Sequence, residues 1–412
     1  MDSFGNKSAD EWVNEGDALS KEHLHEEALT AFTCALELDS ENASAWYQKG
    51  CVLDALHRYE ESVDAYCRAL EYDPDDIPCR FNLGFALFNL EHYEEAVAAY
   101  DMVIASDPDY PRVWFKKGNA LYKLECCDEA LACYDWALER DPDDSDAWHN
   151  KAVILDKMHR YEEAVLAYER FLEHNPSWAG VWSKMGTSLL RLGRYEEALA
   201  ACERAIALDS GMADVWYIKG IVLSGLHREE EALACYDRAI EIDPEFASAW
   251  YYKAHLLNKL HRYDEGLMCF DRSAACARDP VSVFCSKAVA LGHLQLYEEE
   301  IEVLEEAIAI NSRDPACWYN MGIALSGLHR YEEAAEAYDR AVEIDPEDAS
   351  AWYNKGNTMM RLKRYEDALA DYNRAIAINP EYASAWYNKG IALSGLNRMD
   401  EAIQAHQVWK DL

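Results

Sequence analysis

The sequence predicts an all-α protein built from twelve tandem pairs of helices. Trp recurs every 34 residues from Trp12 to Trp386, and no residue is inserted or deleted between these two. Two of the twelve aromatic positions hold Arg80 and Phe284 within an otherwise intact pattern. We therefore expect one array over residues 9–412 rather than the roughly three domains that length alone suggests, with aromatic positions at 12, 46, 80, 114, 148, 182, 216, 250, 284, 318, 352 and 386.

The first helix of each repeat is predicted from spacings of four and seven residues. We number positions from the aromatic one, so that a small residue lies at +4 and Leu (once Met359) lies at +7, on one face of a helix. Gly within a helix costs about 0.5–1 kcal/mol. Its recurrence at +4 therefore predicts a close approach of a second helix, and the residues at +4 are Gly16, Gly50, Gly84, Gly118, Ala152, Gly186, Gly220, Ala254, Ala288, Gly322, Gly356 and Gly390.

The second helix begins with a Tyr-Glu-Glu-Ala pattern, as in Tyr331 to Ala334, and continues with Ala and Tyr at helical spacings. Pro or Ser follows most second helices, and Pro cannot continue a helix. Between the two helices, His and Arg recur at +11 and +12, as in His329-Arg330. Basic side chains there favour the negative end of the first helix, so we interpret these pairs as structural.

Two regions depart from the pattern. The ninth repeat, at about 274–312, lacks Trp and has Glu300 and Leu304 where Ala and Tyr are usual. Because each repeat is held mainly by its neighbours, we expect a softer joint there. The last helix carries Ile403 and Trp409 on an apolar face. That face predicts self-association near Trp409, a longer parent protein, or a tolerated apolar end.

Composition narrows the partners. The net charge of −38 repels phosphate backbones and anionic lipids, so neither nucleic acid nor a membrane is expected. Residues 1–8 form a polar N-terminal leader without the features of a signal peptide, and no run of apolar residues is long enough to span a bilayer. The thirteen scattered cysteines indicate reduced thiols. We therefore expect a cytoplasmic protein.

The repeat resembles the tetratricopeptide repeat (TPR) family, whose pattern is W-x2-L-G-x2-Y, then A-x3-F, then A and P. The resemblance covers about residues 10–412, and the Trp-Tyr-Asn-Lys-Gly run is similar to prokaryotic and archaeal members. It implies a right-handed superhelical α-solenoid of antiparallel helix pairs, whose first helices line a concave groove that binds proteins or peptides. The family's Leu at +3 is Lys in eight repeats, for instance Lys117. We expect these side chains to cover the seam between repeats and to reach solvent with their ammonium groups.

Motifs for catalysis are absent from the sequence. It contains no GxGxxG, Walker loop, HExxH, GxSxG or CxxC pattern. We therefore expect no enzymatic activity, no cofactor and no metal site.

The groove predicts two binding features. Amide side chains at +2 can hold a peptide backbone, since they offer donors and an acceptor; they include Asn82, Asn150, Asn320, Asn354 and Asn388. Repeats three to six add cations to the same strip, although Asp146 and Asp156 lie among them. These cations are Arg112, Lys116, Lys123, Lys157, Lys184 and Arg191. We expect the strip to bind an acidic or C-terminal peptide segment.

Family members that bind chaperone tails use a two-carboxylate clamp of Lys, Asn and Arg over three repeats, and this sequence matches the clamp only in part. One window has Asn82, with Tyr47 and Cys51 where the first Lys and Asn belong. The other has Asn119 and Asn150, with Phe115 and Gly180 in place of the lysines. Lys and Arg are also exchanged, which is not neutral at bidentate sites.

The sequence favours a non-enzymatic scaffold or adaptor that binds protein segments in this groove. Two alternatives stay open. The chain can be the substrate-selecting arm of a larger enzyme, such as a glycosyltransferase, or a structural protein that self-assembles through its last helix.

Overall fold

The structure is a computed structural model that describes residues 7–412, and these form 24 α-helices. Most of the predicted polar leader, residues 1–6, lies outside the described part, and Ser8 is the N-cap of the first helix. The all-α fold class is confirmed. In the described part, no helix is long and apolar enough to cross a membrane. The chain divides into two compact units, residues 1–208 and 209–412, and one continuous array of twelve repeats stays a prediction.

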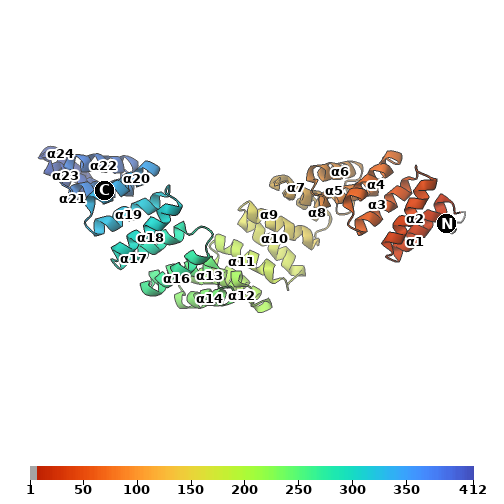
Figure 1. The fold of residues 1–412 in the computed structure, drawn as a ribbon, viewed down its shortest axis with the longest axis horizontal. Helices are drawn as coiled ribbons and strands as arrows, with labels where there is room; N and C mark the ends of the chain where they lie inside the picture. Colours follow the sequence, from red (N-terminus) through yellow and green to blue (C-terminus); the bar gives the residue numbers. More distant parts are fainter. Residues whose placement is uncertain (1–6) are drawn as a thin grey trace. The chain divides into compact units, whose positions relative to one another are not determined.

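The first unit contains six helix pairs, drawn from red to yellow-green in Figure 1. Odd-numbered helices are the first helices of a repeat and even-numbered helices are the second: α1 (Ala9–Lys21), α2 (His25–Leu38), α3 (Ala43–Ala55), α4 (Tyr59–Tyr72), α5 (Ile77–Asn89), α6 (Tyr93–Ser106), α7 (Val113–Lys123), α8 (Cys127–Arg140), α9 (Ser145–Lys157), α10 (Tyr161–His174), α11 (Ala179–Arg191) and α12 (Tyr195–Leu208).

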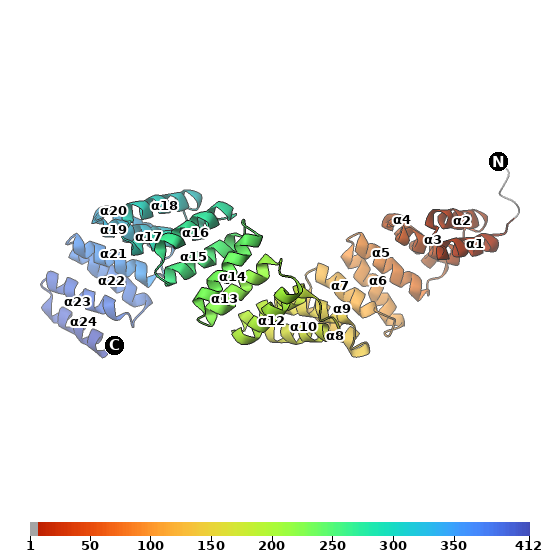
Figure 2. The ribbon, with the colours of Figure 1, turned by 90° about the horizontal axis from the view of Figure 1, so that it is seen from below.

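The second unit contains the other six pairs, and Figure 2 shows each pair packed against the next within it. Its helices are α13 (Ala213–Gly225), α14 (Glu229–Ile242), α15 (Ala247–Lys259), α16 (Tyr263–Cys276), α17 (Val281–His293), α18 (Tyr297–Ile310), α19 (Pro315–Gly327), α20 (Tyr331–Ile344), α21 (Ala349–Arg361), α22 (Tyr365–Ile378), α23 (Ala383–Gly395) and α24 (Met399–Asp411).

Within a repeat, the glycine at +4 packs against the aromatic ring at +20. A Cβ atom added to Gly50 would lie 2.5 Å from the ring of Tyr66, and one added to Gly220 would lie 2.5 Å from Tyr236. Both tyrosine rings are buried. The close approach predicted from the small residue at +4 is confirmed.

The turn between the two helices has one geometry in all repeats. The residue at +11 adopts a left-handed backbone with φ near 60°, and it is His in six repeats: His23, His57, His159, His227, His261 and His329. The arginine at +12 forms an ion pair with the acidic residue at +15, as between Arg330 and Glu333 at 2.6 Å. The carboxylate raises the pKa of this arginine, and the guanidinium lowers the pKa of Glu333. The His-Arg pairs thus belong to the turn.

Two side chains in the first helix connect successive repeats. The indole Nε1–H of Trp donates to the carbonyl oxygen six residues earlier, at the Pro or Ser that ends the preceding repeat; for Trp352 and Pro346 this distance is 3.0 Å. The lysine at +3 forms an ion pair with an Asp of the preceding repeat, as between Lys253 Nζ and Asp237 Oδ1 at 2.5 Å. The Lys253 side chain is 19% exposed and Asp237 is 52% exposed, so the pair lies at the surface of the seam. That the ammonium groups themselves reach solvent stays a prediction.

The ninth repeat forms α17 and α18 but contains an unusual buried carboxyl group. Glu300 is 2% exposed, and its Oε2 has no hydrogen-bond partner among the described residues. It replaces the usual alanine and fits because Gly292 opposite has no side chain: an added Cβ would lie 3.0 Å from Oε2. Burial raises the pKa of Glu300 to about 7.

We predict that Glu300→Ala removes a pH-dependent loss of stability. The folded-state pKa exceeds the ordinary value, so stability is full below pH 4.5 and falls as pH rises through 7. The wild type should lose about 3 kcal/mol over this range relative to the variant. Urea unfolding between pH 5 and 8 measures the difference. Glu299→Ala, an exposed neighbour, serves as control; parallel pH profiles for wild type and Glu300→Ala would contradict the prediction.

Candidate peptide-binding face

Apart from Arg112 at −2, the predicted binding residues lie on the first helices at +2, +5 and +9, and we call these positions the first-helix face. In the first unit this face carries the predicted cations, and the structure divides them by whether they already have a carboxylate partner.

Arg112 and Lys116 are constrained by neighbouring groups. Arg112 precedes α7 with a left-handed backbone (φ 59°), after Pro111, so it does not lie on the helical face that the spacing predicts. Its Nη2 donates to Asp146 Oδ2 at 2.8 Å, and its guanidinium lies 4.6 Å from the ring centre of Phe115. Lys116 is partly buried, and burial together with Arg112 lowers its pKa. Arg112 is therefore occupied by a carboxylate and Lys116 is partly shielded from solvent, so neither is readily available to a ligand.

The residues at +9 form a series of cations on three successive first helices, α7, α9 and α11. They are Lys123, Lys157 and Arg191. Lys157 Nζ lies 3.0 Å from Glu125 Oε1, and this carboxylate raises the pKa of Lys157. Lys123, Arg191 and also Lys184 are exposed and have no carboxylate partner among the described residues. Of the six predicted cations on this face, those available to a ligand are therefore Lys123, Lys184 and Arg191.

The amides at +2 bond mainly to the preceding repeat. Asn354 Nδ2 donates to Tyr319 Oη at 2.8 Å, and Asn388 Nδ2 donates to Tyr353 Oη at 3.1 Å. The tyrosine in each pair lies at +1 of the preceding repeat. The amide ladder is thus partly a structural connection between repeats, which sequence spacing alone did not reveal.

The two partial clamp windows use their amides in the same way. Asn82 Nδ2 donates to Tyr47 Oη at 3.3 Å and to Cys51 Sγ at 3.6 Å. Asn119 Oδ1 accepts from Asn150 Nδ2 at 2.9 Å. Tyr47 and Cys51 break the clamp pattern. They also accept hydrogen bonds from the Asn82 amide, which would bind a carboxylate in a clamp.

Repeats eleven and twelve contain a continuous chain of hydrogen-bonded amides. Asn357 Nδ2 donates to Asn354 Oδ1 at 3.4 Å, and Asn357 Oδ1 accepts from Asn388 Nδ2 at 2.8 Å. Asn320 differs, because Cys285 stands where the preceding repeat usually has Tyr. Its amide has no hydrogen-bond partner among the described residues, and it is therefore available to a ligand.

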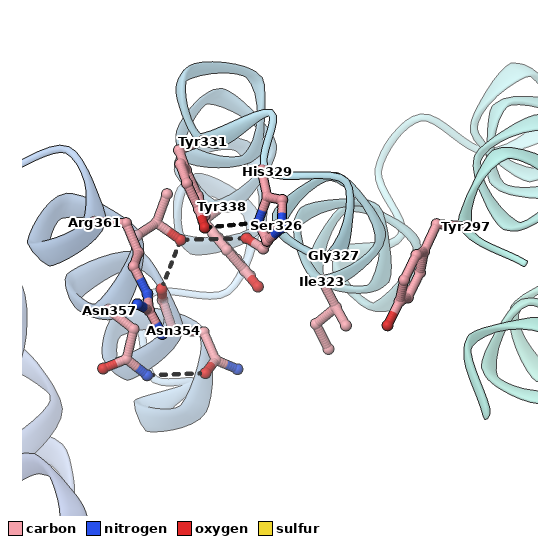
Figure 3. A pocket seen from close by; sticks show the side chains of 11 residues that line it. Tyr297, Ile323, Ser326, Gly327, His329, Tyr331, Tyr338, Asn354, Asn357 and Arg361 are labelled. Atoms are coloured by element: carbon pink, nitrogen blue, oxygen red, sulfur yellow. Dashed lines mark hydrogen bonds between the residues drawn. The ribbon is translucent and has the colours of Figure 1, made fainter. Parts of the chain in front are cut away.

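A hollow of about 470 Å³ lies beside the chain of amides and is lined by repeats nine, ten and eleven. Figure 3 shows Arg361, Asn354 and Asn357 on one side and Tyr297 on the other. The remaining lining residues are polar or aromatic apart from an aliphatic side chain and a glycine: Ile323, Ser326, Gly327, His329, Tyr331, Tyr338 and Thr358. Gly327 occupies +9 because Tyr297 packs there; an added Cβ would lie 2.7 Å from its ring.

Arg361 is the residue that sequence reasoning missed. It lies at +9, as do Lys123, Lys157 and Arg191 in the first unit, and the same positional rule would have found it. It is exposed and has no hydrogen bond or ion pair among the described residues, whereas Arg330, Arg364 and Arg398 nearby in sequence each pair with a carboxylate. The hollow thus contains a cation that no acidic side chain neutralises.

The C-terminal helix α24 is partly covered by its own repeat. Trp409 lies 5.0 Å from Tyr387 between ring centres and is 38% exposed, while Ile403 is 68% exposed. Self-association through this helix stays a prediction.

The helix pairs and the contacts between their successive first helices define a helical-repeat protein. The sequence matches the tetratricopeptide repeat at residues 43–76, 83–148, 149–213, 183–244, 235–268, 319–383 and 360–411. The chain belongs to the tetratricopeptide repeat family. Residues 25–56 also match the protein prenyltransferase alpha subunit repeat.

No curated protein matches the chain, but several solved structures are similar. YrrB, a TPR protein with an unusual peptide-binding site, is 26% identical over 46% of this chain and 98% of its own, with a TM-score of 0.40. Yeast Tom70 is 15% identical over 98% of this chain and 92% of its own, with a TM-score of 0.44. A tetratricopeptide repeat protein from Parabacteroides merdae ATCC 43184 is 15% identical over 58% and 94%, with a TM-score of 0.43.

We predict that Tyr319→Phe destabilises the second unit by about 1 kcal/mol, because the amide of Asn354 loses its hydroxyl partner. Urea unfolding followed by circular dichroism measures the change. Tyr387→Phe is the matched control, since Tyr387 occupies the same position and its hydroxyl has no hydrogen-bond partner in the described residues. Equal effects of the two substitutions would mean that the hydroxyl–amide bond contributes nothing.

Proposed function

We propose that this chain is a non-enzymatic scaffold that binds extended acidic segments of partner proteins on its first-helix face. The observation that carries the proposal is the unpaired Arg361 in a polar hollow beside a chain of amides. In a protein of net charge −38, a free arginine inside a concave site provides specific recognition of a carboxylate.

The chemistry of the hollow suits a peptide. The guanidinium of Arg361 presents a planar fork of donors that matches a carboxylate in bidentate geometry. Each Asn amide carries two N–H donors, and Asn354 and Asn357 each use one of theirs in the bonds described. The second donors can meet carbonyl oxygens of an extended backbone. Tyr297 and Ile323 add apolar surface for a side chain.

The first unit supports the same function with a different arrangement. Lys184 and Arg191 lie seven residues apart on α11 and share one helical face. Lys123 occupies the +9 position two repeats earlier. Exposed lysines act as diffuse charge rather than a bidentate site, so this strip attracts an acidic segment with little sequence preference. We propose it as a second contact region for the same class of partner.

We predict that Arg361→Glu weakens binding of acidic peptides at least tenfold. The probe is an array of unstructured peptides made in Asp-containing and Asn-containing versions. Binding of the Asp version should depend on Arg361, because a carboxylate now faces a carboxylate. Arg340→Glu makes the same charge change at an exposed arginine on α20 that pairs with Glu343, and it should bind as the wild type does. Equal losses in both variants would assign the effect to net charge and remove the hollow as the site.

We predict that Lys184→Glu with Arg191→Glu flattens the salt dependence of acidic-peptide binding in the first unit. Screening of exposed charges acts over about 8–10 Å at physiological salt, so the wild-type affinity should fall steeply between low and physiological ionic strength. The control is Arg170→Glu on α10, whose side chain is 61% exposed and pairs with Glu173. A double variant with wild-type affinity and salt slope would exclude this strip.

A further inference from the structure

Two thiols and a carboxylate meet at the joint between the ninth and tenth repeats. Cys285 lies on α17, Asp314 is the N-cap of α19, and Cys317 lies in the first turn of α19. One potential ligand atom from each, two Sγ atoms and a carboxylate oxygen, lie within 4.8 Å of one another. Cys317 is fully buried and Cys285 is half-buried, while Asp314 is partly exposed, so an ion can reach the group from the Asp314 side.

The three residues of this cluster occupy regular positions of the repeat, and the cluster arises because two of these positions hold cysteine here. Position +1 usually holds an aromatic residue that packs against the next repeat, and here it holds Cys285. Position −1 of the next repeat is a small buried residue, here Cys317, and position −4 is the helix cap, here Asp314. The three positions are therefore brought together by the fold itself and held on rigid helix ends.

We propose that Cys285, Cys317 and Asp314 bind a thiophilic divalent cation, with Zn²⁺ as the prime candidate. Zn²⁺ takes Cys sulfur at about 2.3 Å and carboxylate oxygen at about 2.0–2.2 Å in a tetrahedron, so its ligand atoms lie roughly 3.5–4 Å apart. The group in the structure needs only a small contraction to reach this. Two thiolates favour a soft or borderline ion over Mg²⁺ or Ca²⁺. Water can supply the fourth ligand, since the cluster is open to solvent.

The ion would replace a connection that this joint lacks. In other repeats a tyrosine hydroxyl at +1 bonds the amide at +2 of the next repeat, as Tyr319 does with Asn354. Because Cys285 has no such hydroxyl, Asn320 receives no equivalent bond. A metal bridge from α17 to α19 would fix the ninth repeat to the tenth by other means.

The chain contains its own comparison site. Asp76 caps α5 and accepts from the backbone N–H of Cys79 at 2.9 Å, in the positions of Asp314 and Cys317. There, however, Tyr47 occupies the position of Cys285, so only one thiol is present. The proposal therefore assigns a metal to one joint and not to the other. The sequence expectation of no metal site followed from the absence of a short motif, whereas here the ligands come from two repeats.

The test is a titration of the full chain with Zn²⁺, and separately with Cd²⁺, in the presence of a phosphine reductant. Cd²⁺–thiolate binding is followed by its ultraviolet charge-transfer absorption, and Zn²⁺ binding by calorimetry and by protons released from the two thiols. Cys285→Tyr and Cys317→Ala restore residues that other repeats have at these positions, so both should fold. Cys79→Ala removes a buried thiol at the −1 position of the comparison joint and is the matched control.

The wild type and Cys79→Ala should each bind one more equivalent of metal ion than Cys285→Tyr and Cys317→Ala do. Zn²⁺ should raise the Tm of the wild type and of Cys79→Ala only. Asp314→Asn keeps the cap, since Asn42 caps α3 at the same position, but should weaken binding at least tenfold. If all variants bind the same number of ions, the site does not exist. A Cys285–Cys317 disulfide in protein that binds no Zn²⁺ after reduction would likewise overturn the proposal.

Discussion

In ten of the twelve repeats a ring at +20 faces the small residue at +4, and the rest of the structure depends on the helix spacing that this contact sets. A Cβ at Gly50 would lie 2.5 Å from Tyr66, so this spacing leaves no room for a larger side chain without movement. Because every repeat keeps the same length, the same side chains meet at every joint. The Trp indole, the lysine at +3 and the amide at +2 are all placed by this register.

The sequence predicted the helix pairs and the close approach at +4, because these depend on spacing alone; binding at the first-helix face stays a prediction. It could not predict which polar groups are already occupied. The partner of Lys253 is Asp237 of the preceding repeat, and the partner of Asn354 is Tyr319. Such pairs depend on how far one repeat is displaced from the next in space, and the spacing of residues in the sequence does not contain this displacement.

The same distinction decides which cations can bind a ligand. Residue type alone does not distinguish Arg112 from Arg361, but Arg112 lies in the turn before α7, after Pro111, and bonds to Asp146. Arg361 stays on α21 and meets no carboxylate among the described residues. This chain has about twice as many acidic as basic side chains, so most cations can find a carboxylate partner. A cation without such a partner therefore indicates a binding site more selectively than the presence of Lys or Arg alone.

The ninth repeat combines several departures that have one physical consequence. Glu300 places a carboxyl where alanine packs, and Cys285 removes the hydroxyl that would bond Asn320. Each change weakens either the helix pair or its joint with the tenth repeat, yet α17 and α18 form with ordinary lengths. Under our predictions, the α17–α18 pair becomes less stable as Glu300 ionises, and a metal ion at the thiols strengthens the joint with the tenth repeat. Tyr297 of α18 also lines the hollow at Arg361, so the same repeat contributes to the proposed binding site.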